Sequence, residues 1–265
     1  MSIYLYTPKE INTIREGGRI LAQILEQVSQ QVKPGVSTKE LDDLAEKLIL
    51  ERGGQVAFNG YQPASCDKPF PTTMCTSVND EVVHAPASSS RILKDGDIIG
   101  LDIGMRYKGY YTDHAITVGV GKISKSAEKL IEVTKHALSL GIQQAKIGNT
   151  VYDISLAIQQ YIEDNGFSVV RALVGHGVGK QIHEEPAIPN FTHKYSKKVY
   201  LKQGMVIAIE PMINIGDYEV EIATDGFTYK TSDNSLSAHF EHTIAIGKNG
   251  GIVLTETRGG SFLAS

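Results

Sequence analysis

Two stretches of this sequence repeat each other closely enough to suggest an internal duplication. The segment 93–102 reads LKDGDIIGLD and resembles LKQGMVIAIE at 201–210, at an offset of 108 residues. A second match, DHAITVG at 113–119 with EHTIAIG at 241–247, has an offset of 128 residues. Chance similarity of two strands is the alternative. Because each match keeps an acidic residue at the same place, we favour two related halves that share one sheet.

Hydrophobic periodicity predicts the same order of elements in both halves, two helices followed by strands. Capping boxes at Thr7 with Glu10 and at Ser37 with Glu40 predict a helix over 8–31 and another that ends at glycines 53–54. Further helices are predicted over 126–145 and about 150–166. Residues typical of strands occupy 72–78, 81–84, 97–105, 109–119, 205–209, 218–223 and 240–246. The sequence therefore predicts the α+β class and a single domain over 1–265, with halves at about 7–120 and 124–255.

Composition excludes several classes of protein. The chain has 265 residues, 41% of them hydrophobic, which suits one large core. The formal net charge of −4, without a basic tail, gives no sign of nucleic-acid binding. No basic segment followed by a long apolar run marks a signal peptide or membrane helix, so we expect a cytoplasmic protein. With only Cys66 and Cys75, a disulfide scaffold or cysteine zinc finger is excluded, and two free thiols are expected.

Acidic residues fall at matching places in the two predicted hairpins. A turn centred after residue 107 would set Asp102 directly opposite Asp113, where like charges repel each other. Two solvated surface acids are the alternative, but the apolar neighbours of Asp102 favour burial. The duplication places Glu210 and Glu241 at equivalent positions. Four buried carboxylates are costly unless cations neutralise them, and two divalent ions would balance the charge, with Mn, Fe(II), Zn or Co as candidates.

Three histidines are candidates for the same site. Glycines flank His176 and give no packing reason for an imidazole there, so a metal-ligand role is favoured. His183 follows after seven residues, unlike the four of a helical zinc motif, so we do not expect the two to ligate one metal from one helix. His84 and His183 could supply donors to a carbonyl oxygen and a leaving amine. For His239 a place beside the metal site and ordinary packing both stay open. The other histidines are expected to be structural or at the surface: His114, His136, His193 and His242.

Taken together, these motifs resemble the type I methionine aminopeptidases of the pita-bread metallopeptidase superfamily. They are Cys75–Asn79 before His84, Asp102 with Asp113, Gly-His-Gly-x-Gly at 175–179, His-Glu-Glu-Pro at 183–186, Glu-Pro-Met at 210–212 and Ser-Ala-x-x-Glu-His at 237–242. The resemblance implies a pita-bread fold, in which two pseudo-symmetric αα-β halves share a curved, mostly antiparallel sheet with helices on its outer face. It also implies metal-dependent hydrolytic removal of the initiator methionine when the second residue is small.

The resemblance assigns roles around two divalent ions. Asp102 would chelate one metal, Asp113 and Glu241 would bridge both, and His176 and Glu210 would complete the other. A bridging water or hydroxide would be the nucleophile, because metal coordination lowers its pKa. Glu210 would accept its proton.

The resemblance also implies how substrate is bound. His84 would contact the scissile amide, and His183 would hold the carbonyl oxygen. Asn79 and Ser237 match positions near a monovalent-cation site. A methionine pocket would be apolar and suited to sulfur, and its candidates by position are Tyr61, Phe70, Cys75, Ile182 and Phe227. The implied partners are nascent polypeptide N-termini close to the ribosome, with no membrane or nucleic-acid contact and a monomeric chain.

Several positions depart from the family pattern and leave the pocket shape and inhibitor preference open. Phe58 replaces a common cysteine, His239 replaces a common glutamine, and Ile182 and Phe227 stand where Phe and Trp are usual. Residues 62–69, with Cys66, resemble an insertion. Two other functions compete with the first: a prolidase or X-Pro aminopeptidase, and a non-catalytic binding module. Prolidases usually carry a large N-terminal domain, and binding modules typically lose the ligands.

Overall fold

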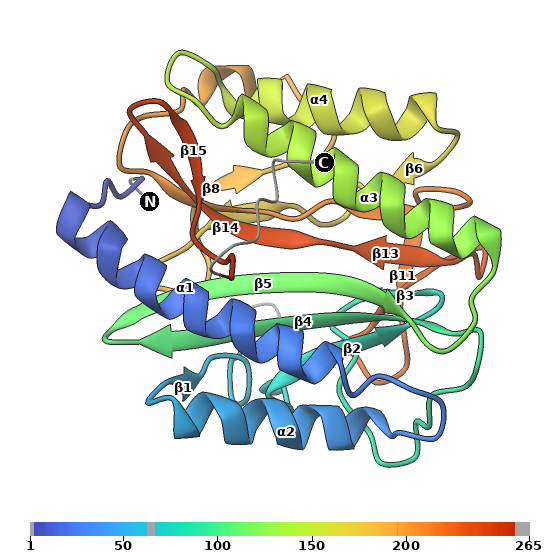
Figure 1. Cartoon of the computed structure of the whole chain (residues 1–265). Helices are drawn as coiled ribbons and strands as arrows, with labels where there is room; N and C mark the ends of the chain where they lie inside the picture. The colour runs from blue at the N-terminus through green and yellow to red at the C-terminus, as the bar shows by residue number, and fades with distance from the viewer. Residues whose placement is uncertain (1–2, 63–66, 195, 258–265) are drawn as a thin grey trace.

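The computed structural model describes residues 3–62, 67–194 and 196–257, and within them four helices lie outside a curved sheet (Figure 1). Each half contributes a pair, α1 (Pro8–Ser29) with α2 (Thr38–Glu51) and α3 (Lys125–Gln144) with α4 (Val151–Asp164). The capping boxes of Thr7 and Ser37 are both formed. The predicted helices are therefore confirmed, with ends that differ from the expected ones by one or two residues.

The main sheet joins the two halves edge to edge through antiparallel pairs. Its order is β1–β4–β5–β14–β9–β7–β8, while β2 also pairs with β4 and β15 with β14. The bounds are β1 (Gln55–Val56), β2 (Met74–Val78), β4 (Ile98–Tyr107), β5 (Tyr110–Gly119), β7 (Gly175–Gly177), β8 (Glu184–Ile188), β9 (Val206–Ile209), β14 (Glu241–Gly247) and β15 (Gly250–Val253). Strands β4 and β5 mirror β9 and β14, with β5 against β14 in the middle. This arrangement is what the internal duplication predicts.

Shorter strands lie beside this sheet and complete the surroundings of its centre. One small sheet has the order β13 (Ser237–His239), β10 (Met212–Asn214), β6 (Ser168–Val169). The other has the order β11 (Val220–Ile222), β12 (Tyr229–Thr231), β3 (Glu81–Val83). A 3₁₀ turn, η1, spans Ser196–Lys198. The segment predicted as a strand over 240–246 corresponds to β14, and β13 before it was not predicted.

The register of the β4–β5 hairpin differs from the predicted one by two residues. Tyr107 pairs with Tyr110, so the turn consists of Lys108 and Gly109, with φ values of 48° and 90°. Two residues with positive φ match the right-handed twist of a hairpin, and Gly109 adopts such a value without strain. Asp102 therefore pairs with Ala115, and Asp113 pairs with Gly104. The prediction that the two acids are directly opposite was wrong, and they are diagonal neighbours.

Each helix pair packs on its own half of the sheet through a separate apolar cluster. Fully buried aliphatic residues in the first half include Leu21, Ile24, Leu41 and Ile49, which pack with strand residues such as Ile99 and Leu101. The second cluster joins Leu138, Ile154 and Ile158 to Ile207 and Ile244. Burial of this apolar surface holds the helices on the sheet and leaves its opposite side free for polar residues.

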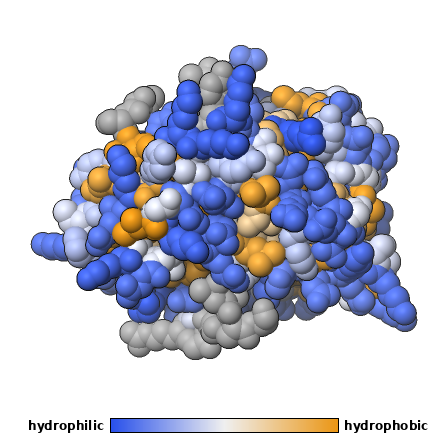
Figure 2. Space-filling model, turned by 90° about the horizontal axis from the view of Figure 1, so that it is seen from above, coloured by the Kyte–Doolittle hydropathy of each residue, from blue (hydrophilic) through white to orange (hydrophobic). Residues whose placement is uncertain are grey.

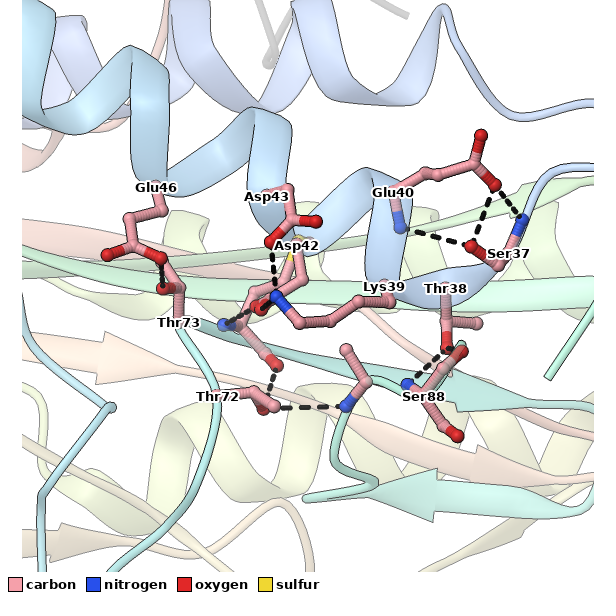
Figure 3. A network of polar contacts seen from close by, with 12 residues as sticks. Ser37, Thr38, Lys39, Glu40, Asp42, Asp43, Glu46, Thr72, Thr73 and Ser88 are labelled. Atoms are coloured by element: carbon pink, nitrogen blue, oxygen red, sulfur yellow. Dashed lines mark hydrogen bonds and ion pairs between the residues drawn. The ribbon is translucent and has the colours of Figure 1, made fainter. Parts of the chain in front are cut away.

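Polar contacts attach the start of α2 to β2 and to the loop that carries Ser88 (Figure 3). The carboxylate of Asp42 is buried and accepts a hydrogen bond of 2.9 Å from the backbone N–H of Met74. Thr38 donates to the backbone oxygen of Ser88 at 3.1 Å, and its hydroxyl accepts from the N–H of Ser88 at 2.9 Å. Thr72 donates to the backbone oxygen of Met74 at 2.9 Å. These bonds fix the strand that carries Cys75 into the centre of the sheet.

The face shown in Figure 2 is mostly hydrophilic, with hydrophobic residues in separate small groups. None of the helices in the described ranges is long and apolar enough to cross a membrane.

Candidate metal centre and active site

Four acidic side chains from four places in the chain line one cavity of about 940 Å³. Asp102 comes from β4 and Asp113 from β5, the central strands of the first half. Glu241 is the first residue of β14, and Glu210 follows the end of β9. The cavity is thus built where the two halves meet. The predicted convergence of the four carboxylates is confirmed.

His176 joins these acids from β7. Ligand atoms of Asp113, His176 and Glu241 all lie within 4.8 Å of one another. Nε2 of His176 is also 3.4 Å from Oε1 of Glu210. The Nδ1–H of His176 donates to the backbone oxygen of Gly177 at 2.9 Å, because a carbonyl oxygen can only accept. This bond leaves the lone pair of Nε2 available as a metal ligand.

The electrostatics of the acids fit a cation. Burial raises the pKa of Asp102 to about 7. Burial, followed by repulsion from neighbouring carboxylates, raises the pKa values of Asp113, Glu210 and Glu241 well above their ordinary range. Oδ1 of Asp102 and Oε1 of Glu241 are buried without a hydrogen-bond partner in the described part of the chain. Buried carboxylate oxygens without donors are costly, and a divalent cation satisfies both the oxygens and the charge.

Two more histidines reach the cavity from loops beside the strands. His84 follows β3 with a φ of 62°, an uncommon value for a residue other than glycine. His183 precedes β8, and its ring lies 4.4 Å from the ring of His176. Burial, and then the charge of His183, lower the pKa of His84 to about 4. Burial also lowers the pKa of His183. Both rings are therefore neutral near pH 7 and can each donate one N–H.

The rest of the cavity wall is largely apolar and aromatic. The ring of Phe70 meets Phe58 at 6.4 Å and Phe227 at 5.5 Å, both edge to face. Cys75 is a buried free thiol whose pKa is raised by burial and by Asp102. Of the predicted pocket residues, those that line the cavity are Tyr61, Phe70, Cys75 and Phe227. Ile182 does not line the cavity but packs in the same apolar cluster.

The remaining predicted positions have mixed outcomes. Asn79 and Ser237 come together, since the N–H of Ser237 donates to the backbone oxygen of Asn79 at 2.8 Å. The expected free thiol of Cys66 lies outside the described residues, as do positions 63–65 of the suggested insertion. Beyond them, Nζ of Lys68 lies 4.8 Å above the ring of Phe227 at the cavity wall.

Sequence reasoning missed three residues around the site. Tyr229 lines the cavity with its ring 5.8 Å from that of His84. The hydroxyl of Thr117 in β5 bonds the backbone N–H and C=O of one residue of β13, and the hydroxyl of Thr243 in β14 does the same for one residue of β5. The two residues so bonded are His239 and Asp113. No local signal marks these residues, because their roles depend on strands that meet only in the folded chain.

His114 and His242 do not line the cavity, which agrees with the prediction that they are structural. Their rings stack at 4.5 Å beneath the joint of β5 and β14. His114 donates from Nδ1 to the backbone oxygen of Glu241, and Nδ1 of His242 lies 2.9 Å from the hydroxyl of Thr255.

The known proteins that this chain resembles are metallopeptidases, which agrees with a metal-binding site in the cavity. The model of metallopeptidase family M24 matches residues 12–248. A methionine aminopeptidase from Aquifex aeolicus is 47% identical over 257 residues, which cover 97% of this chain and 100% of the relative. A crystal structure of methionine aminopeptidase from Rickettsia prowazekii superposes with a TM-score of 0.91 at 36% identity, covering 96% of this chain and 100% of that one.

A more distant likeness shows the fold alone. An Xaa-Pro dipeptidase from Bacillus anthracis has a TM-score of 0.72 at 22% identity, and the match covers 96% of this chain but 62% of the dipeptidase. The identity and coverage favour the aminopeptidase group instead. This chain belongs to metallopeptidase family M24 and, within it, to the type I methionine aminopeptidases of the pita-bread superfamily.

Proposed function

We propose that this chain is a metal-dependent aminopeptidase that hydrolyses the peptide bond after an N-terminal methionine. The observation that carries the proposal is the cluster of Asp113, His176 and Glu241 in a cavity whose other wall is apolar and aromatic. The cluster suits divalent cations, and the apolar wall suits an uncharged side chain.

The donor set supports two divalent ions. Bound ions of this kind lower the pKa of a coordinated water and polarise a carbonyl oxygen. Asp113 and Glu241 would be shared by both ions, Asp102 would hold one of them, and His176 and Glu210 would hold the other. Carboxylate and imidazole donors are compatible with Mn, Fe(II), Co or Zn. We further propose that Asn79 and Ser237, which are hydrogen-bonded to each other through their backbones, lie beside a site for an additional monovalent cation.

The neutral histidines would act on the substrate. The hydroxyl of Tyr61 lies 2.7 Å from Nδ1 of His183. When that hydroxyl donates, Nε2 of His183 carries the proton and can hold the carbonyl oxygen of the tetrahedral intermediate. His84, on the wall with a fixed backbone, would contact the scissile amide and help protonate the leaving amine. Glu210 would accept the proton lost by the nucleophile.

The aromatic wall would select methionine. A thioether packs well against aromatic rings, and the rings of Phe70, Tyr61 and Phe227 line the cavity together with the thiol of Cys75. Ile182 would support this wall from behind. We further propose that the second residue of the substrate must be small, and that the substrates are N-termini of nascent chains in the cytoplasm, close to the ribosome. The chain is predicted to act as a monomer, without binding nucleic acid.

A pair of peptides separates this function from its closest competitor. The wild-type protein with Mn(II) should release free methionine from Met-Ala-Ser and leave Ala-Pro intact. Cleavage of Ala-Pro, with Met-Ala-Ser intact, would instead favour a prolidase. Folded protein that binds no metal and cleaves neither peptide would favour a non-catalytic binding module.

A further inference from the structure

The imidazole of His239 is a buried polar group that the roles above do not explain. His239 is the last residue of β13, and only 3% of its surface is exposed. Its Nε2 has no hydrogen-bond partner among the residues described. A buried donor without a hydrogen-bond partner destabilises the folded state, so the presence of His239 here must be explained by the surrounding site.

The unpartnered nitrogen faces the carboxylate of Glu210. Nε2 of His239 lies 3.7 Å from Oε2 of Glu210, while Nε2 of His176 lies 3.4 Å from Oε1. The carboxylate therefore lies between two imidazoles, one at each oxygen. The separation of 3.7 Å is longer than a hydrogen bond, so the two groups face each other without yet bonding.

The backbone of His239 is fixed on both sides. Thr117 of β5 donates its hydroxyl to the backbone oxygen of His239 at 2.9 Å and accepts from its N–H at 2.9 Å. On the other side His239 pairs with Met212, two residues after Glu210. The N–H of Phe240 also donates to the backbone oxygen of Pro211 at 3.4 Å. The backbone at His239 is thus held by the same segment that carries the carboxylate.

We propose that His239 is a positioning residue: when the metal centre is occupied, its Nε2–H donates to Oε2 of Glu210 and holds that carboxylate toward the metal centre. This inference rests on the proposed function, in which Glu210 is a metal ligand. Carboxylates that bind metals are commonly oriented by a hydrogen bond to their second oxygen, and loss of such a bond lowers metal affinity by roughly 10–100-fold. A glutamine side chain also carries an N–H donor, whereas leucine has a similar size and no donor.

The test is calorimetric titration of chelator-stripped, full-length protein with Mn(II). We expect His239→Leu to bind Mn(II) about 10–100-fold more weakly than the wild type. We expect His239→Gln to restore the affinity to within about threefold, because the donor returns. The matched control is His136→Leu on α3, the same substitution at a ring that lies 4.8 Å from the ring of Tyr161 and does not line the cavity, and it should bind like the wild type.

Wild-type affinity in folded His239→Leu, or equal losses in His239→Leu and His239→Gln, would overturn the proposal. If His239→Leu does not fold, Thr117→Val and Thr117→Ser provide the second test. Loss of the Thr117 hydroxyl should weaken Mn(II) binding, serine should restore it, and equal affinity in both would overturn the proposal. A wild-type protein that binds no Mn(II) would instead refute the proposed function itself.

Discussion

Asp113 is held at both polar atoms of its own backbone. Its N–H donates to the hydroxyl of Thr243 at 3.0 Å, and that hydroxyl donates to its backbone oxygen at 2.8 Å. Thr243 is fully buried in β14, two residues from Glu241. One threonine therefore connects the two strands that carry the shared acids, and it fixes the site before any ligand binds.

Removing either shared acid should abolish turnover. In Asp113→Ala or Glu241→Ala, one carboxylate of the cluster is lost, and we expect methionine release from Met-Ala-Ser to fall below detection. Metal content of the purified variants, measured by atomic emission, should fall as well. Asp43→Ala, an exposed acid on α2, is the control and should keep both properties. Full activity in either cluster variant would refute the two-metal interpretation.

Loss of the His183 side chain should lower the rate of hydrolysis and leave metal binding unchanged. Without its N–H, His183→Ala loses a donor to the carbonyl oxygen, and we expect kcat to fall by about 10²–10³. Calorimetry should show Mn(II) affinity close to that of the wild type. An unchanged kcat would exclude the proposed role, and lost metal binding would instead make His183 part of the metal centre.

Asp233 gives the chain an acid-sensitive contribution to stability. Hydrogen bonds from the Ser235 hydroxyl and from the N–H groups of Asp217 and Ser235 lower the pKa of Asp233 to about 2. The folded state thus favours the ionised form, so this contribution is complete above the ordinary carboxyl pKa of about 4 and is lost as the pH falls toward 2. The residue is exposed, and the effect should be small.

Urea unfolding of the wild type and of Asp233→Asn tests this contribution. The unfolding midpoints of the two proteins should differ more at pH 6 than at pH 3, because protonation of Asp233 removes the stabilising contribution of its carboxylate. An equal difference at both pH values would contradict the assignment.

Among the elements, helices were predictable and strand register was not. The caps at Thr7 and Ser37 are local signals, since each involves residues three apart, and both helices begin where these caps predict. The hairpin register depends on the position of the turn. Lys108 adopts a positive φ in this turn, and lysine is not a residue type that predicts such a conformation. Short strands such as β3, β12 and β13 depend on partners far away in the chain, so no local pattern defines their pairing.

The attachment of α2 to β2 should contribute measurably to stability. Asp42→Ala leaves the buried N–H of Met74 without its acceptor, and we expect the free energy of unfolding to fall by about 1–3 kcal/mol. Chemical denaturation of apoprotein measures this loss. Asp43→Ala removes only an exposed contact with Lys39 and should cost less than about 1 kcal/mol. Equal losses in the two variants would show that the buried hydrogen bond contributes no more to the free energy of unfolding than the exposed contact does.

At the scale of the whole molecule, the duplication explains why the site could be located from the sequence. Each half supplies one hairpin, and β5 lies against β14, so acids at matching positions must converge where the halves meet. The cavity wall could not be derived this way. Phe58, Tyr61, Phe227 and Tyr229 reach it from loops and from the small β11–β12–β3 sheet, which have no counterpart in the duplicated motif.

The most direct test of the central claim is the metal dependence of methionine release by the wild-type protein. Chelator-stripped protein should leave Met-Ala-Ser intact, and addition of Mn(II), Co(II), Fe(II) or Zn(II) should restore release of free methionine with at least one of them. Release at the full rate by folded protein free of metal would contradict the claim that the four buried acids and His176 act by holding divalent cations.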